Sequence, residues 1–294
     1  MTRLFKGDAY VAIQMRDGSM LTLDRMNEEL GRRLCIEFNC PKTRTPMPNK
    51  SMVKIHNLAK PTRDRIATDG EKAFLYAGYP DAGIKLFATG DIVFVDSRRE
   101  SSEWITEVRF GDGMFAFNNS VTSISLGEGE DIGSVIDMLA ADMGKAVSVV
   151  TDKISQITNG ALTFDGLTKD AINVVAEDNG LEWSIQDDEI IIRDRFSPVD
   201  NEAIVINAAS GLYAGVQKTQ KGVKFLCQLN PDLRPGKLIK LEAIGYTIES
   251  GDVAKFVEQG STYDGFYICK NVTALGNNYG GRFDCEVEAE EYDV

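Results

Sequence analysis

The chain has 294 residues, of which 43% are hydrophobic and 26% charged, which suits a globular protein with room for two or three domains. Its net charge of −13 argues against a protein that wraps nucleic acid, because neutralising phosphates requires clustered Lys and Arg. No stretch approaches the roughly 18 apolar residues of a transmembrane helix, and residues 1–8 contain no apolar signal region. We therefore expect a chain made in the cytoplasm, without stable membrane insertion.

The charge is unevenly distributed along the chain. Residues 1–70 hold 13 Lys and Arg against 8 Asp and Glu, a balance of +5. The rest holds 19 against 37, a balance of −18, and the two balances sum to −13. The basic part fits an interface with an acidic partner about as well as it fits an ordinary mixed surface.

The first elements are predicted to be β-strands. Residues 10–15 and 20–23 flank Asp17-Gly18, a dipeptide typical of a hairpin turn. Residues 33–38 and 51–58 alternate apolar and polar side chains, which is the period of a strand. The chain therefore begins with a β unit.

A segment rich in Pro, Lys and Thr separates the last two of these strands. Residues 41–50 predict a long exposed loop or an extended arm, because proline cannot donate a ladder hydrogen bond. Its prolines are Pro41, Pro46 and Pro48.

The β pattern continues after one short helix, which is predicted over residues 61–67 with Pro61 in its first turn. Residues 72–79, 84–95 and 104–110 are predicted strands, and Gly90 suggests a bulge or bend in the second of them.

From residue 127 the pattern changes to that of helices. Apolar residues recur at helical spacing over residues 132–143. Asp131 is the expected N-cap, and Gly144 stands where a glycine ends a helix in the left-handed conformation. A helix therefore follows the first β unit.

This α/β pattern continues for about fifty residues. A strand at residues 162–164 precedes a second predicted helix at 168–179. Residues 182–186 and 189–193 then form a predicted hairpin around Asp187-Asp188. The helix and hairpin resemble the short N-terminal domain of secretins and outer-membrane receptors.

The C-terminal part returns to strands. Residues 223–229 alternate in polarity, and Asn230-Pro231 and Arg234-Pro235-Gly236 predict turns. Further strands are predicted at 265–273 and 282–290, which gives an antiparallel unit of the size that curls into a small barrel.

These segments carry a resemblance to a known family. The run G-V-K-F-x-C-x-L-N-P-x-L-R-P-G, the strand G-x-Y-x-C-K-x-V and the ending N-N-Y-G-G-R-F resemble the baseplate (tail) hub proteins of tailed bacteriophages. The earlier series I-x-N-L-A-K-P-T-R, Y-A-G-Y and F-x-x-G-x-I is similar to the first barrel of that family. The similarity is one of pattern and includes no catalytic signature.

The resemblance implies a mainly β fold with an α/β insertion, made of two small antiparallel tail-tube-like β-barrels plus an inserted α/β domain. The expected domains are residues 1–126 for the first tail-tube-like β-barrel, 127–200 for the inserted α/β domain and 201–294 for the second tail-tube-like β-barrel.

No catalytic, cofactor-binding or metal-ligating residue is predicted. His56 is the single histidine, which excludes a histidine triad or a multi-histidine metal site within one chain. The S-x-x-K match at Ser51 and Lys54 falls in a strand, where the two side chains point to opposite faces. Cys35 and Cys40 have no second cysteine or histidine pair near them in sequence, which argues against zinc. Paired carboxylates for glycoside cleavage stay possible because Asp and Glu are abundant.

The other cysteines, Cys227, Cys269 and Cys285, are scattered. Cys227 and Cys285 stand at apolar strand positions and are interpreted as buried free thiols.

The resemblance implies a structural protein that joins the distal end of the tail tube to the central spike and carries no active site. Its expected partners are the tail tube protein, the central spike protein and other baseplate proteins, and DNA would pass through without specific binding. The expected location is the tail baseplate of the virion, assembled in the host cytoplasm.

Three alternatives stay open. The nearest is the hub-like part of a type VI secretion spike or of another contractile injection system. A tail-associated cell-wall hydrolase is a different class, but the sequence leaves no segment long enough for the extra domain. A carbohydrate-binding module would be indicated by exposed aromatic clusters.

The expected assembly is a homotrimer, in which three chains with two barrels each supply six similar units of a closed ring. A monomer that assembles only on the baseplate is the alternative. Sheet edges would join the barrels. The predicted edges are residues 51–57, with Val53 and Ile55, and residues 282–290, with Phe283 and Val287; the predicted arm contains Pro41, Pro46 and Pro48.

Overall fold

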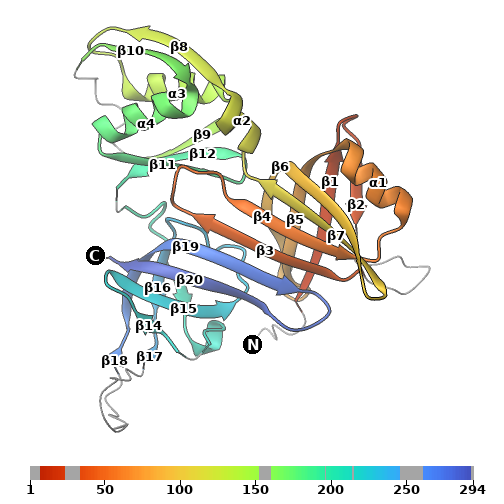
Figure 1. Ribbon diagram of the computed structural model, residues 1–294. Coiled ribbons are helices and arrows are strands. Elements are labelled where there is room, and N and C mark those ends of the chain that lie inside the picture. Colours follow the sequence, from red (N-terminus) through yellow and green to blue (C-terminus); the bar gives the residue numbers. More distant parts are fainter. Residues whose placement is uncertain are drawn as a thin grey trace, which may run out of the picture.

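The computed structural model describes residues 7–23, 34–151, 160–195, 197–213, 215–245 and 261–292. One large, mainly antiparallel sheet system is built from both the N-terminal and the C-terminal parts of the chain, and a smaller α/β unit lies at one end of it (Figure 1). Within the described ranges, no helix is long and apolar enough to cross a membrane.

The described residues of the N-terminal part form seven antiparallel strands and one helix, α1 (Lys60–Asp69), which begins at a proline-containing first turn as predicted. Their spatial order is β3-β4-β7-β6-β5-β1-β2. The strands are β1 (Asp8–Met15), β2 (Met20–Leu23), β3 (Ile36–Thr43), β4 (Lys50–His56), β5 (Gly70–Tyr79), β6 (Gly83–Glu100) and β7 (Glu103–Gly111).

The C-terminal part adds the order β14-β15-β20-β19, in which every neighbouring pair is antiparallel. Beside this path, β16 pairs with β19 and, in parallel, with β13. The elements are β13 (Ile204–Ile206), η2 (Ala208–Ser210), β14 (Gln217–Lys218), β15 (Gly222–Gln228), β16 (Leu238–Leu241), β17 (Ile244–Gly245), β18 (Ser261–Thr262), β19 (Gly265–Asn277) and β20 (Phe283–Glu291).

The two parts are joined through hydrogen-bonded pairing of β19 with β3, from Asn271 opposite Thr43 to Asn277 opposite Glu37. Because β19 is 13 residues long, one of its edges pairs with β16 over residues 265–268 and with β3 over residues 271–277, while its other edge pairs with β20. The strands therefore form one continuous 13-stranded sheet within the described residues.

The mainly β, antiparallel architecture with an α/β insertion is confirmed. The two expected barrels do not appear as separate closed units: among the described strands, the pairing path ends at β14 on one side and at β2 on the other, and these ends do not meet. The reason is that β3 pairs with β19. In two separate barrels, each of these strand edges would instead pair within its own barrel.

One hydrophobic core lies beneath the continuous sheet and takes residues from both parts of the chain. At the junction the Phe283 ring meets Phe38 and Tyr79 edge-on, at centroid distances of 5.6 Å and 5.5 Å. Gly276 lies against the same cluster, since a Cβ there would come within 2.1 Å of the Phe38 ring. The sheet and the core are thus shared.

The α/β unit has a second core of its own, which takes residues from Ala116 to Ile192. Strand β8, expected in the first barrel, pairs with β10 in this unit, while β12 pairs with β11 and β9. The unit consists of α2 (Met114–Asn119), β8 (Val121–Leu126), α3 (Ile132–Asp142), β9 (Ala146–Val150), β10 (Leu162–Leu167), α4 (Thr168–Asp178), β11 (Leu181–Gln186) and β12 (Glu189–Asp194).

Candidate functional site

The two strands predicted to be edges lie inside the sheet. β4 is paired with β3 on one side and β7 on the other, and β20 lies between β15 and β19. Val53, Ile55 and Val287 are fully buried in the shared core, and Phe283 is partly buried against it. The prediction of unpaired edges at these residues was wrong, because β7 and β15, which pair with the second edges of β4 and β20, lie far away in the sequence.

The predicted proline arm is largely part of the fold. Pro41 belongs to β3 and stands opposite Thr273, and Pro48 is buried. The remaining loop is short and contacts the α/β unit of the same chain, where Arg44 donates to Glu182 with an Nη2–Oε2 distance of 2.8 Å. The expected long exposed arm was therefore wrong, although Pro46 is half-buried and Met47 is exposed. A role of this loop toward a neighbouring chain stays a prediction.

The continuous sheet has a polar face opposite its core. The register places Glu37 across from Lys54 and Asn277, and Lys54 across from Glu107. The same alternation carries the face from β6 to β15, so both parts of the chain contribute to one surface. We call it the polar sheet face; its charged members are Glu37, Lys54, Asp96, Arg98, Glu107, Arg109, Lys224, Asp284, Glu286 and Glu288.

Carboxylates outnumber cations on this face, and neighbouring strands pair them. The Glu107 carboxylate forms ion pairs with Arg98 at 3.2 Å and with Arg109 at 2.6 Å, while Lys224 contacts Glu286. Burial raises the pKa of Glu107, but the hydrogen bonds from Arg109 and Arg98 outweigh it and hold the pKa below its usual value. The polar sheet face thus carries both positive and negative side chains, with an excess of negative ones.

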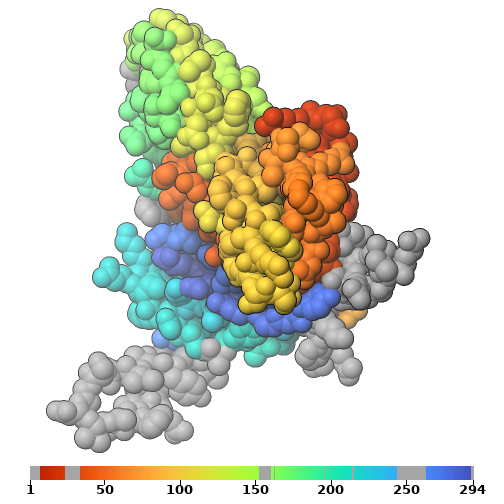
Figure 2. Space-filling model, turned by 45° about the vertical axis from the view of Figure 1, so that its right-hand side comes forward, coloured from red at the N-terminus to blue at the C-terminus, as the bar shows by residue number. Residues whose placement is uncertain are grey.

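An apolar ridge borders the polar sheet face on β6. The β6–β7 register shifts between Ile92 and Phe94, and this bulge leaves Val93 and Phe94 exposed at 52% and 47%. Arg109 lies over the Phe94 ring at 5.0 Å from its centroid. The β6–β7 hairpin, in yellow-orange, runs along the front of the molecule in Figure 2. This is a surface on which another protein chain could pack.

The α/β unit is fastened to the sheet through its β11–β12 turn. Asp187 pairs with Lys42 at 2.9 Å, and Asp188 pairs with Lys72 at 2.9 Å and contacts Lys145. Burial raises the pKa of Asp188, yet Lys145 and Lys72 hold it below its usual value.

Asp112, which follows β7, accepts the backbone N–H groups of Asp187 and Asp188. Burial, with a smaller contribution from the Asp187 carboxylate, raises the pKa of Asp112 to about 7 despite these hydrogen bonds. The fastening therefore contains one carboxyl group that titrates near neutrality.

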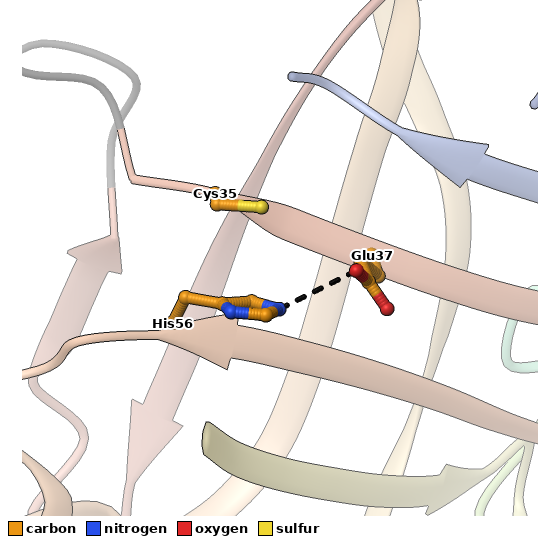
Figure 3. A group of neighbouring side chains, drawn as sticks. All are labelled: Cys35, Glu37 and His56. Atoms are coloured by element: carbon orange, nitrogen blue, oxygen red, sulfur yellow. Dashed lines mark ion pairs between the residues drawn. The ribbon is translucent and has the colours of Figure 1, made fainter. Parts of the chain in front are cut away.

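A second cluster lies where β3 begins and β4 ends. The side chains of Cys35, Glu37 and His56 carry donor atoms that all lie within 4.8 Å of one another. The His56 ring points toward Glu37, with Nε2 at 3.5 Å from Oε1 (Figure 3). Glu103, the first residue of β7, faces the other ring nitrogen with an Oε2–Nδ1 distance of 3.0 Å. The sequence argued against zinc at Cys35 and Cys40 and did not predict this set, because cross-strand pairing assembles it.

The remaining thiols are structural. Cys40, Cys227, Cys269 and Cys285 are buried and free, which confirms the interpretation of Cys227 and Cys285. Burial raises the pKa of Cys40 and Cys285 to about 12, so neither provides a thiolate at neutral pH. They act as small core hydrophobes.

A family model described as "Baseplate hub gp41" matches residues 10–244 of the chain. No curated protein matches the sequence.

Solved structures with the same fold include two tail proteins. The 43 kDa tail protein of prophage MuSo2 from Shewanella oneidensis has a TM-score of 0.61 and 6% identity, covering 97% of this chain and 98% of that one. The tail protein from Neisseria meningitidis MC58 has a TM-score of 0.61 and 9% identity, covering 96% of both chains.

A third similar structure is an E. coli component of the type VI secretion system, itself described as similar to T4 tail proteins. Its TM-score is 0.58 at 10% identity, over 88% of this chain and 74% of that one. At these identities the likeness concerns the fold.

Proposed function

Because the chain belongs to the Baseplate hub gp41 family, and is therefore a structural tail protein, we propose that it is the adaptor that joins the distal end of a tail tube to a central spike. Association with other tail and baseplate proteins follows from the family. The proposal adds the position between tube and spike, and a trimeric assembly.

The observation that carries this proposal is the continuous sheet. Both parts of the chain present strands on one polar sheet face, joined through β3 and β19. A ring of three such chains repeats this surface and offers two sheet segments per chain, six in all, which suits a sixfold neighbour on one side and a threefold neighbour on the other. Closed rings of this kind arise when one head-to-tail interface repeats until it meets itself.

The contacts between chains are proposed to use the apolar ridge more than the sheet ends. Among the described strands, the path ends at β2 with four residues and at β14 with two, which offer few backbone groups for strand addition. Val93 and Phe94 instead provide apolar area beside charged groups, the composition of a protein–protein contact. The ridge is therefore the proposed interface.

We also propose the domain division. Of the expected domains at 1–126, 127–200 and 201–294, the inserted one is supported by the separate core of the α/β unit, whereas the other two share one sheet and one core. The pairing of β8 with β10 moves its start to α2.

The test is the mass of the purified chain in solution by light scattering coupled to size exclusion. A trimer of 32.4 kDa chains gives about 97 kDa, three times the chain mass. Val93→Asp should shift the mass toward the monomer, because a charge in an apolar contact loses its hydration without gaining a partner. The matched control is Val121→Asp, an exposed strand valine of the α/β unit, which should leave the mass unchanged.

Two results would contradict the proposal. One is a monomer at all concentrations together with monomers in assembled particles. The other is a trimer that the Val93→Asp substitution leaves intact. This result would show that the apolar ridge is not the interface, although the chain is trimeric.

A further inference from the structure

We propose that Cys35, Glu37 and His56 form a zinc-binding site on the polar sheet face, with water in the fourth position. The donor set is one thiol, one carboxylate and one imidazole, and all three types are common zinc ligands. A thiolate ligand favours Zn²⁺ over Mg²⁺ and Ca²⁺, which take oxygen ligands.

Strand register brings these residues together. The backbone N–H of His56 donates to the carbonyl of Cys35 at 3.0 Å, which continues the β3–β4 ladder beyond Ile36 and Ile55. Cys35 and His56 are thus cross-strand neighbours, and Glu37 stands two residues along on the same face. The three side chains consequently converge on one spot (Figure 3).

The distances suit a metal after small side-chain rotations. A tetrahedral zinc ion with bonds of about 2.0–2.3 Å holds its ligand atoms roughly 3.3–3.8 Å apart. The Glu37–His56 contact, at 3.5 Å, already meets this spacing, and the donor atoms of Cys35 lie within 4.8 Å of both. Rotation about one side-chain bond moves the thiol of Cys35, so the backbone can stay in place.

A second observation points to a cation at this spot: Nε2 of His56 is buried, and no group among the described residues forms a hydrogen bond with it. The contact of Glu103 with Nδ1, at 3.0 Å, places the ring proton on that nitrogen and turns the Nε2 lone pair toward Glu37. Two lone pairs facing each other at 3.5 Å repel unless a cation lies between them. Either a metal ion or a proton on His56 satisfies this geometry.

The surroundings favour the metal. A carboxylate on the far nitrogen of a histidine is a frequent arrangement around bound zinc, because it fixes the ring and raises its basicity. Asn277 orients Glu37 by donating from Nδ2 to Oε1 at 3.1 Å, and its Oδ1 lies 3.8 Å from the Cys35 sulfur. A groove of about 380 Å³ opens beside Glu37 and Asn277, so one of the three proposed ligands borders open space.

Zinc there would link the start of β3 to the end of β4. Cys35 directly precedes β3, Glu37 lies within it and His56 ends β4, while Asn277 at the end of β19 contacts the ligand Glu37. Binding to the folded chain stabilises it in proportion to the logarithm of the free zinc concentration.

The experiment is a zinc titration of the full-length chain, stripped with a chelator, against a competing chromophoric chelator. We expect one zinc per chain, and at least a 100-fold loss of affinity in His56→Gln and Cys35→Ser. Glu103→Gln should weaken binding by about 10- to 100-fold, as for other groups behind a ligand. Glu71→Gln, at an exposed position on β5, is the matched control and should bind as the wild type does.

Cobalt substitution is a second readout on the wild-type fold. Co²⁺ at the site should give a thiolate-to-metal charge-transfer band that Cys35→Ser loses. The proposal is overturned if the wild type binds zinc no better than His56→Gln, which would leave a proton as the cation on His56. It is also overturned if Cys35→Ser binds with full affinity or shows the same cobalt band.

Discussion

Two glycines occupy positions where a side chain would clash with neighbouring atoms. At Gly236 the backbone has a φ of 86°, and a Cβ would come within 1.9 Å of the Arg193 guanidinium and 2.4 Å of Val199. At Gly276 the strand passes directly beneath the Phe38 ring. The first position connects the α/β unit to the C-terminal strands, and the second connects the two parts of the sheet.

Gly276→Ala is expected to lower the free energy of unfolding by about 1–3 kcal/mol, since the added methyl group must displace the Phe38 ring from a packed aromatic cluster. Gly127→Ala is the matched control, because no atom lies within 4 Å of the added carbon and it should change stability by less than about 0.5 kcal/mol. Denaturant unfolding measures both, and equal effects in the two variants would contradict the assigned close approach.

Asp112 makes stability depend on pH in an unusual direction. Its pKa is about 7 in the folded chain, above the value of about 3.9 for an unfolded aspartate. The folded state therefore binds more protons than the unfolded state between these values. The contribution of Asp112 is fully present below pH 4 and is lost as the pH rises through 7.

The stability of the wild type relative to Asp112→Asn should consequently fall as the pH rises from 5 to 7, by up to about 1.4 kcal/mol per pH unit. The loss of one hydrogen-bond acceptor in the variant adds a constant offset. Chemical denaturation at several pH values measures this difference, with the exposed Asp165→Asn as control. A difference that stays constant over this range would refute the role of Asp112.

Residue-scale features with local causes were predictable. Asp131 caps α3 by accepting the N–H of Ser134 at 2.9 Å, and Gly144 has a φ of 62° after that helix, both as expected. The bulge expected at Gly90 is not there: the register of β6 shifts at Phe87 against β5 and at Val93 against β7, while Gly90 lies where its backbone approaches that of Gly111. A close approach between distant segments leaves no local sequence signal.

The α/β unit has its own core and is attached to the large sheet through the β11–β12 turn. We predict that a fragment of residues 113–195 folds alone and unfolds cooperatively, because its buried apolar residues form a core separate from that of the larger sheet. Thermal unfolding followed by near-ultraviolet circular dichroism tests this. A broad, non-cooperative transition would show that the fastening to Lys42 and Lys72 is required for folding.

Strand identity was predictable, whereas strand partners were not. Alternation places Val53 and Val287 on an apolar face, and both are in the core as alternation requires. Whether β4 and β20 are edges depends on pairing with β7 and β15, which alternation does not report. The Cys35, Glu37 and His56 cluster escaped notice for the same reason, since only the β3–β4 register aligns them.

At the scale of the whole molecule, the acidic balance of the polar sheet face matters if this face lines a passage for DNA. We predict that the wild type does not retain duplex DNA at physiological salt, because phosphates meet excess carboxylates. The triple variant Asp284→Lys, Glu286→Lys, Glu288→Lys should gain salt-dependent DNA binding.

A control with the same change in net charge is Asp137→Lys, Asp142→Lys, Asp170→Lys on the exposed helices of the α/β unit. It should gain less affinity, since its charges are spread over two helices. Electrophoretic mobility shifts at increasing salt compare the variants. DNA binding by the wild type, or equal gains in both variants, would count against the proposed lining.

The junction of β3 with β19 also has a consequence for synthesis on the ribosome. The outer backbone groups of residues 36–43 stay unpaired until residues 271–277 have been synthesised. At about 5–20 residues per second, translation of the intervening chain takes roughly 10–50 s. During that interval β3 is an open strand edge next to an incomplete apolar core, the condition in which nascent chains associate wrongly. Early truncations of this protein should therefore aggregate, while the complete chain closes its own edge.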